Sequence, residues 1–184
     1  GLAFWAARHQ TVPGAPELHG PQDAVTAIAA LPRLDPDAPS AGPGISGRLA
    51  VLDGLDGLPA GLDGWGPQVP EPDAALDELI GAAARVLASR DDAPIAFCHA
   101  VPAPAAVRLV LPERPADLAR ASVAVSWQVV GAIVAAFAVP RDPAEAEAAD
   151  ADPESLLERL VPRAVEHGDE HVVKLTEAAG REYA

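Results

Sequence analysis

The distribution of proline constrains the fold of this chain more than any other feature of its sequence. Eleven of the 20 prolines fall before residue 73, in segments such as TVPGAPELHGP and PRLDPDAPSAGPG. Proline fixes φ and has no backbone N–H to donate, so these segments are expected to be connectors. Between them we expect a short helix at 22–31 and a short helical piece near 45–53. An irregular loop should follow, anchored to the core by Trp65.

From residue 73 onward the pattern is helical. Apolar residues of DAALDELIGAAARVLASR recur with a helical period, starting near Asp73. Pro102 and Pro104 divide PIAFCHAVPAPAAVRLVLP into two short helices, with His99 just before the break. A final helical region is expected from about residue 154 to the end, interrupted at Pro162. No segment shows convincing strand alternation, so the sequence predicts an all-α fold: an irregular helical bundle with long Pro/Gly-rich connectors.

The length of 184 residues fits a single helical domain, residues 1–184. Hydrophobic residues make up 49% of the chain but aromatic residues only 4%, so alanine and valine must fill much of the core. Such a core depends on close approach between helices. The first residues, GLAFWAARHQ, are typical of the last turns of an amphipathic helix, and the chain contains no methionine. We therefore expect it to be the C-terminal part of a longer domain.

The run from 121 to 139 carries no charge and has the length of a membrane span. Its polar residues, its many alanines and its lack of leucine favour a buried central helix instead. Trp127 and Gln128 would then lie in the interior, where the indole N–H and the amide need partners. Both are candidates for substrate binding, and satisfied core residues are the more frequent alternative.

The charge and the cysteine content exclude several classes of function. Thirteen Lys and Arg against 27 Asp and Glu give a formal net charge of −14, which repels nucleic acid and anionic membrane surfaces. A single cysteine, Cys98, excludes an internal disulfide and a multi-cysteine zinc site. Cys98 is more typical of a buried inert thiol than of a nucleophile. No signal peptide is recognisable. We expect a cytoplasmic protein that acts on a small-molecule substrate.

The segment GPGISG at 42–47 matches the dinucleotide fingerprint G-x-G-x-x-G letter for letter. The fingerprint works because it follows a buried strand and opens a helix whose N-terminal amides hold pyrophosphate. Here DPDAPSA precedes it, which cannot be that strand. We interpret the match as coincidental, and the phosphate-loop, G-x-S-x-G and H-E-x-x-H motifs are absent.

Two histidines near the C-terminus carry the main chemical signal. The stretch RAVEHGDEHVVKLTEA places His167 and His171 four residues apart, so both lie on one side if they share a helix. On such a helix His171 points along the apolar face and Asp169 almost directly away from it. That face holds Leu157, Leu160, Ala164, Gly168, Leu175 and Ala178. A glycine inside a helix costs about 1 kcal/mol relative to alanine, which indicates a close approach at Gly168.

Three interpretations of these histidines stay open. The most frequent is a core histidine bonded to a backbone carbonyl or a nearby carboxylate. Of the two functional interpretations, proton transfer is preferred over metal binding. A metal site would need further ligands, for which His99 is the obvious candidate and His9 and His19 are less well placed.

Several segments together resemble the C-terminal half of questin oxidase-like proteins: GLAFWAARHQ, APIAFCHAVPAPAAVRLVLP, SVAVSWQVVGAIVAAFA and AVEHGDEHVVKLTEAAGREY. The most specific parts are F-x-H-A-V around His99 and G-D-E-H-x-x-K-x-T-E-A at 168–178. This chain has Pro102 where threonine is usual in the family, a departure that affects the turn beside His99. Family members are fungal secondary-metabolism enzymes and bacterial relatives, and they are substantially longer.

The resemblance implies an oxidoreductase. The named fungal members open an anthraquinone ring by Baeyer–Villiger oxygen insertion with NADPH and O₂, and they lack a recognisable flavin fingerprint. By this hypothesis His171, His99 and His167 are the catalytic residues, acting as acid or base. Trp127, as an aromatic wall, and Gln128 would contact an aromatic polyketide-like ketone. The alternative is a non-catalytic helical module whose histidines only pack.

Overall fold

The computed structural model describes residues 9–90, 94–138 and 152–183. Within these residues the secondary structure is helical, and the one extended pairing is an isolated bridge between Gln22 and Trp65. The prediction of an all-α fold is confirmed. In chain order the helices are α2 (Ala24–Ala30), α3 (Gly44–Leu49), η1 (Leu52–Gly54), α4 (Leu58–Leu62), α5 (Pro72–Ala88), α6 (Pro94–Ala100), α7 (Pro102–Val110), η2 (Leu111–Glu113), α8 (Ala116–Phe137), α9 (Pro153–His167) and α10 (Glu170–Tyr183).

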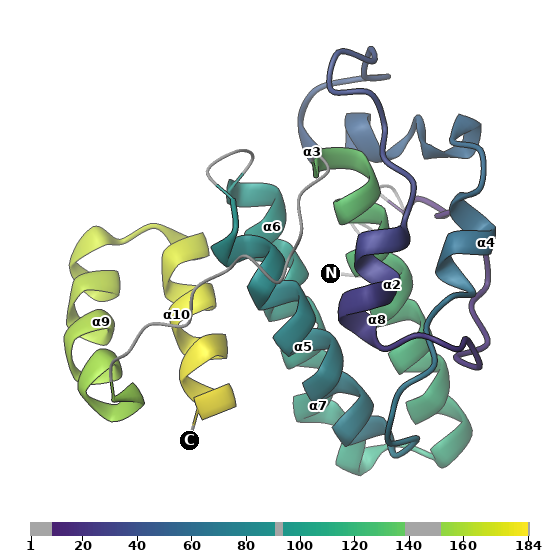
Figure 1. Cartoon of the computed structure of the whole chain (residues 1–184). Coiled ribbons are helices and arrows are strands. Elements are labelled where there is room, and N and C mark those ends of the chain that lie inside the picture. Colours follow the sequence, from purple (N-terminus) through teal and green to yellow (C-terminus); the bar gives the residue numbers. More distant parts are fainter. Residues whose placement is uncertain (1–8, 91–93, 139–151, 184) are drawn as a thin grey trace.

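Helix α8 is the centre of the fold, and α3, α4, α5, α6 and α7 all pack against it (Figure 1). By length and composition it could cross a membrane, but 56% of its most apolar window is buried inside the protein. Its inward side chains include Val123, Trp127, Val130 and Val134, each at most 1% exposed. This burial by protein fits the expected central helix.

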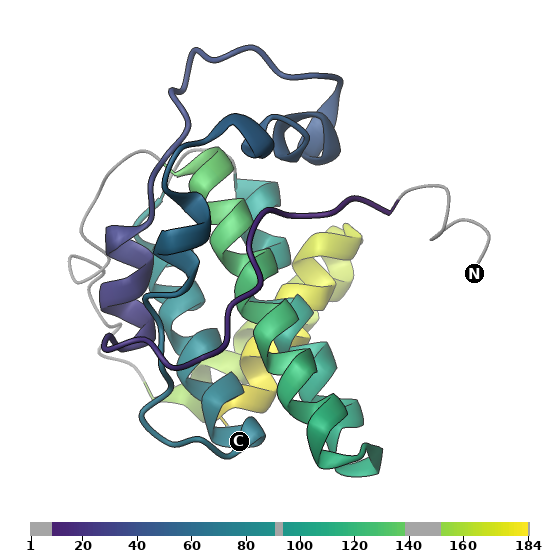
Figure 2. The ribbon, with the colours of Figure 1, turned by 90° about the vertical axis from the view of Figure 1, so that its right-hand side faces the viewer.

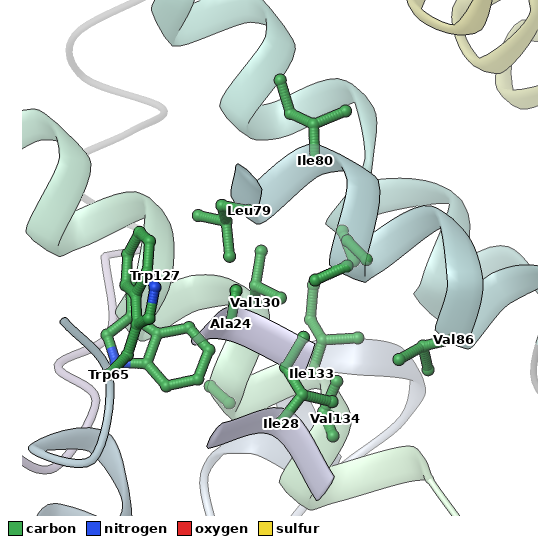
Figure 3. Close-up of a cluster of buried hydrophobic side chains, with 14 of the residues drawn as sticks. Ala24, Ile28, Trp65, Leu79, Ile80, Val86, Trp127, Val130, Ile133 and Val134 are labelled. Carbon is green, nitrogen blue, oxygen red and sulfur yellow. The ribbon is translucent and has the colours of Figure 1, made fainter. Parts of the chain in front are cut away.

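The core is built from aliphatic and small side chains around two tryptophans. The rings of Trp65 and Trp127 lie 5.3 Å apart at a tilt of 56°, next to side chains from α2, α5 and α8 (Figure 3). Gly131 permits the close approach that an alanine-rich core requires. A Cβ at Gly131 would lie only 2.5 Å from Cδ2 of Leu62, so a larger residue would push α4 away from α8.

The first connectors are fixed by a few hydrogen bonds to the helical part. Gly20 N donates to Trp65 O (3.0 Å), and Gly66 N donates to Gln22 O (3.0 Å). The carboxylate of Glu78 on α5 accepts from three donors: the backbone N–H of Ala24, the indole of Trp65 and the backbone N–H of Gln68. Trp65 is fully buried. The prediction that it anchors this loop is confirmed, although the loop also contains α4, which was not predicted.

A second connector is held by one buried guanidinium. Arg48 on α3 donates to the backbone carbonyls of Asp35 (2.6 Å), Ala38 and Ala136 (3.0 Å). It thereby joins the proline-rich segment after α2 to the C-terminal end of α8. A buried arginine is tolerated here because its donors meet backbone acceptors.

The break between α6 and α7 occurs at Val101, as the prolines predicted. The final region differs from its prediction. Helix α9 continues through Pro162, so the predicted interruption there is wrong. The chain instead turns at Gly168, which has φ = +73° and ends α9, and a new helix starts after it. Glycine is favoured at a helix end with positive φ because it has no Cβ to clash.

Helices α9 and α10 form a hairpin on one side of the molecule (Figure 1). Helix α10 packs against α6 and α7, while the principal neighbour of α9 is α10. With the molecule turned by 90°, the N-terminal segment from residue 9 is seen to run along α8, on the side away from this hairpin (Figure 2). The hairpin therefore brings His171 to α6, the helix that carries His99.

Candidate functional site

The structure brings His99 and His171 together. Their ring centroids lie 5.2 Å apart, and the rings are nearly perpendicular at 84°. His99 stands in the last turn of α6 and His171 in the first turn of α10, so the packing of α10 on α6 creates the pair. Both side chains are partly exposed, with 25% of the His171 side chain open to solvent. Solvent can therefore reach both side chains.

Asp169 holds the ring of His171. Its Oδ1 accepts from the backbone N–H of His171 at 2.8 Å and lies 3.1 Å from Nδ1 of the same residue. These hydrogen bonds, the backbone one first, lower the pKa of the Asp169 carboxyl. An ionised carboxylate favours the tautomer that carries a proton on Nδ1, which leaves Nε2 as the acceptor nitrogen of a neutral ring.

His99 is disposed to stay neutral. Burial lowers the pKa of its imidazole, and the nearby His171 and Lys174 lower it further, while Glu170 opposes them. Lys174 and Glu170 form an ion pair of 2.5 Å one turn apart on α10. A neutral imidazole has a free lone pair, so His99 can act as a proton acceptor.

Cys98 precedes His99 and is also only partly buried. Burial raises the pKa of its thiol, and the charge of Asp169 raises it further. A thiol with a raised pKa is a poor nucleophile because the thiolate is the reactive form. The expectation of an inert thiol agrees with this environment.

His167 does not share the side of the helix that the sequence predicted for it. That prediction assumed one continuous helix, whereas α9 ends at His167 and α10 begins at Glu170. The side chain of His167 is exposed. Gly168 is not at a close approach either, since a Cβ built on it would meet nothing within 4 Å. Leu160, expected beside His171, is 43% exposed. The positive φ of Gly168, rather than packing, explains the glycine.

The two candidate substrate contacts both lie on α8, Trp127 in the core and Gln128 against the N-terminal connector. Trp127 is fully buried, and its indole donates to Leu62 O at 2.7 Å. The amide of Gln128 donates to Val12 O (2.8 Å) and Gly14 O (2.6 Å), which ties the N-terminal segment to α8. The N–H groups of both side chains thus donate to protein carbonyls, and neither residue belongs to the His99–His171 pair.

Sequence reasoning missed Asp169 as a partner of His171. The signal that could have revealed it is local: an aspartate after a glycine commonly caps the helix that follows, and its carboxylate then bonds the N–H two or three residues later. Of the other histidines, His19 lies 3.1 Å from the guanidinium of Arg120. Among the described residues no group of three His, Cys, Asp or Glu side chains is arranged to hold a metal ion.

The G-x-G-x-x-G match does not form a nicotinamide dinucleotide site, which needs N–H groups or cations around the phosphates. Helix α3 starts within the G-x-G-x-x-G match and has six residues. It packs against the segment that leads into it, since a Cβ at Gly47 would lie 1.9 Å from Gly42 O. The guanidinium of the adjoining Arg48 donates to backbone carbonyls, and that of Arg33 donates to Ile28 O at 2.7 Å.

Comparison of the chain with protein-family models, with curated proteins and with solved structures found no match. The functional assignment therefore depends on the site itself and on the resemblance described above.

Proposed function

We propose that the chain is the histidine-bearing part of a questin oxidase-like oxidoreductase, and that His99 accepts a proton from a phenolic aromatic ketone during its oxygenation. The observation that carries this proposal is the edge contact between the rings of His99 and His171, at 5.2 Å. It pairs a base of lowered pKa with a second imidazole whose orientation is fixed by Asp169.

The proton transfer has a clear chemical purpose. When His99 takes the phenolic proton, the phenolate that remains is electron-rich and reacts more readily with O₂. Oxygen insertion beside a ketone consumes one O₂ and two electrons: ketone, O₂, NADPH and a proton give ester, NADP⁺ and water. His99 returns its proton when the product leaves, which makes it a general base and then a general acid.

The charges around His99 act on this step in opposite directions. A proton on His99 places a positive charge beside the His171 ring. Glu170 favours that charge, while His171 and Lys174 oppose it. We assign no described residue to the nicotinamide cofactor; NADPH enters only as the reductant that the resemblance implies.

The test combines binding with turnover. The purified chain is mixed with a panel of hydroxylated anthraquinones and related phenolic ketones, and phenolate absorbance, NADPH oxidation and O₂ uptake are followed. We expect a phenolate signal at neutral pH that His99→Gln abolishes and His171→Ala weakens. The matched control is His167→Gln, which changes an exposed histidine at the end of α9 and should leave the signal unchanged. Equal loss in His99→Gln and His167→Gln would contradict the proposal.

One observation favours a second candidate, a non-catalytic helical module. The hydrogen bonds of Asp169 to His171 also cap α10, and capping aspartates commonly make such bonds without any catalytic role. In that case the two histidines only fix α10 against α6. This candidate predicts that His99→Gln lowers stability while no phenolic ketone in the panel gives a phenolate signal with the wild-type chain.

A further inference from the structure

A cavity of about 560 Å³ lies between α5, α7 and α10. It exists because α10 packs against α6 and α7 and leaves a space over α5. Its walls are aliphatic or small, including Ile80, Gly81, Leu87, Val101, Leu175 and Ala179. No aromatic side chain is among the described residues that line it. Its volume falls within the range of small-molecule sites, about 300–1,000 Å³.

One end of this cavity carries charge. Arg108 on α7 contacts Asp77 and Glu182, which line the cavity with it, and also Asp73 (Nε–Oδ1 3.1 Å). Three carboxylates around one guanidinium leave a negative excess when all are ionised. The adjacent Arg181 does not cancel it, because its guanidinium is paired with Glu177 at 2.5 Å.

Glu182 lacks one partner. Its Oε2 accepts from Arg108 at 2.7 Å, but its Oε1 is buried and has no hydrogen-bond partner among the described residues. Only 16% of this side chain is exposed. Burial raises the pKa of the carboxyl even though Arg108 acts in the opposite direction. A buried carboxylate oxygen without a donor is costly, so the site is short of a hydrogen-bond donor.

We propose that this cavity binds a primary amine with an aliphatic chain, its ammonium group on Glu182 and Asp77 and its chain along α5 between Leu87 and Leu175. The ammonium brings three N–H donors and a positive charge to an end where three carboxylates surround one guanidinium. The chain covers aliphatic walls that offer no ring to stack on. A fatty carboxylate is disfavoured by the same charges. The site does not use His99 or His171, so it stands apart from the proposed function.

The experiment measures binding by isothermal titration calorimetry on the whole chain, with three probes of equal chain length: octylamine, 1-octanol and octanoate. We expect octylamine to bind at least about tenfold more tightly than 1-octanol, as a hydrogen bond to a charged group implies, and octanoate to bind most weakly. Equal binding of octylamine and 1-octanol would show that apolar burial alone acts there and would overturn the proposal, as would the absence of saturable binding.

Variants locate the site. Gly81→Leu projects a side chain into the cavity from a position where a Cβ meets nothing within 4 Å, and leucine is the better helix former. It should abolish octylamine binding, and Ala84→Leu, on the same wall, provides a second blocking variant. Ala106→Leu adds the same side chain at an exposed position of α7 outside the cavity and should leave binding unchanged.

The head group is tested separately. Glu182→Gln should weaken octylamine by about tenfold while leaving 1-octanol unchanged, because only the charged partner is removed. Circular dichroism melting confirms that each variant is folded. If folded Gly81→Leu and Ala84→Leu variants both bind octylamine as the wild type does, the amine binds elsewhere and the proposal is wrong.

Discussion

At the scale of single residues, the site depends on three side chains: one from α6, one from α10 and one from the turn before α10. The sequence predicted that His171 points toward the core and indicated His99 as a possible neighbour. The centroids of the two rings lie 5.2 Å apart. It placed Asp169 on the opposite side, and this was wrong. The error has a local cause: the positive φ of Gly168 ends α9, so Asp169 lies outside both helices and its carboxylate accepts from the first turn of α10.

The lowered pKa of His99 predicts a specific sensitivity to acid. Its ordinary value is 6.5 and burial, the largest cause, lowers it, so in the window just below 6.5 the unfolded chain binds the proton more readily than the folded chain. The stability that this group contributes is full above pH 6.5 and is lost as the pH falls toward the folded pKa. His99→Gln cannot take the proton, so it should lose less stability on acidification than the wild type.

This is measured by urea unfolding at about pH 7.5 and about pH 5.5, with the free energy of unfolding compared between the two. His167→Gln is the control, since His167 is exposed and far along the chain from α6. It should show the same loss as the wild type. An identical pH dependence in wild type and His99→Gln would mean that His99 is protonated as easily in the folded chain as in the unfolded one.

At the scale of elements, helix formation follows the local sequence closely. The prolines at 102 and 104 end α6 and start α7, and Asp23 caps α2 by accepting from Thr26 N at 2.7 Å. The exception is Pro162, which α9 contains. A proline removes one hydrogen bond from a helix, and that cost did not outweigh the rest of this 15-residue helix.

The contact between α4 and α8 depends on Gly131. We expect Gly131→Ala to lower the free energy of unfolding by about 1–3 kcal/mol, because its Cβ would lie 2.5 Å from Cδ2 of the fully buried Leu62. The matched control is Gly81→Ala in α5, whose Cβ meets nothing within 4 Å and which should stabilise by about 0.5–1 kcal/mol. Urea unfolding of both variants checks the opposite signs; a neutral Gly131→Ala would show that α4 can shift without loss.

At the scale of the whole molecule, the chain forms a packed core around α8 with a helical hairpin beside it (Figure 1). The outer helix α9 leaves Leu160, Val161 and Val165 exposed by 43%, 48% and 70%. By contrast, residues 130–136 of α8 are all buried. We therefore expect α9 to be locally less stable than α8, because regions with few buried apolar contacts open at lower free energy.

Amide hydrogen exchange should therefore rank the helices. We expect the amides of α9 to exchange fastest, those of α10 more slowly because α10 packs on α6 and α7, and those of α8 slowest. Exchange followed by mass spectrometry or NMR gives the order directly. Equal protection of α9 and α8 would mean that the hairpin and the core unfold as one cooperative unit, contrary to this prediction.

The sequence by itself determined the all-α class, the helices from residue 73 to the end of α8, the break before Pro102 and the anchoring role of Trp65. These follow from proline, helical periodicity and one large apolar side chain, all of which act over a few residues. Only the tertiary structure decided that His171 meets His99 and that α10 leaves a cavity over α5 with Glu182 at its end. The reason is physical: the packing of α10 on α6 and α7 sets which side chains of different helices meet. That packing is not encoded in the spacing of residues along one helix.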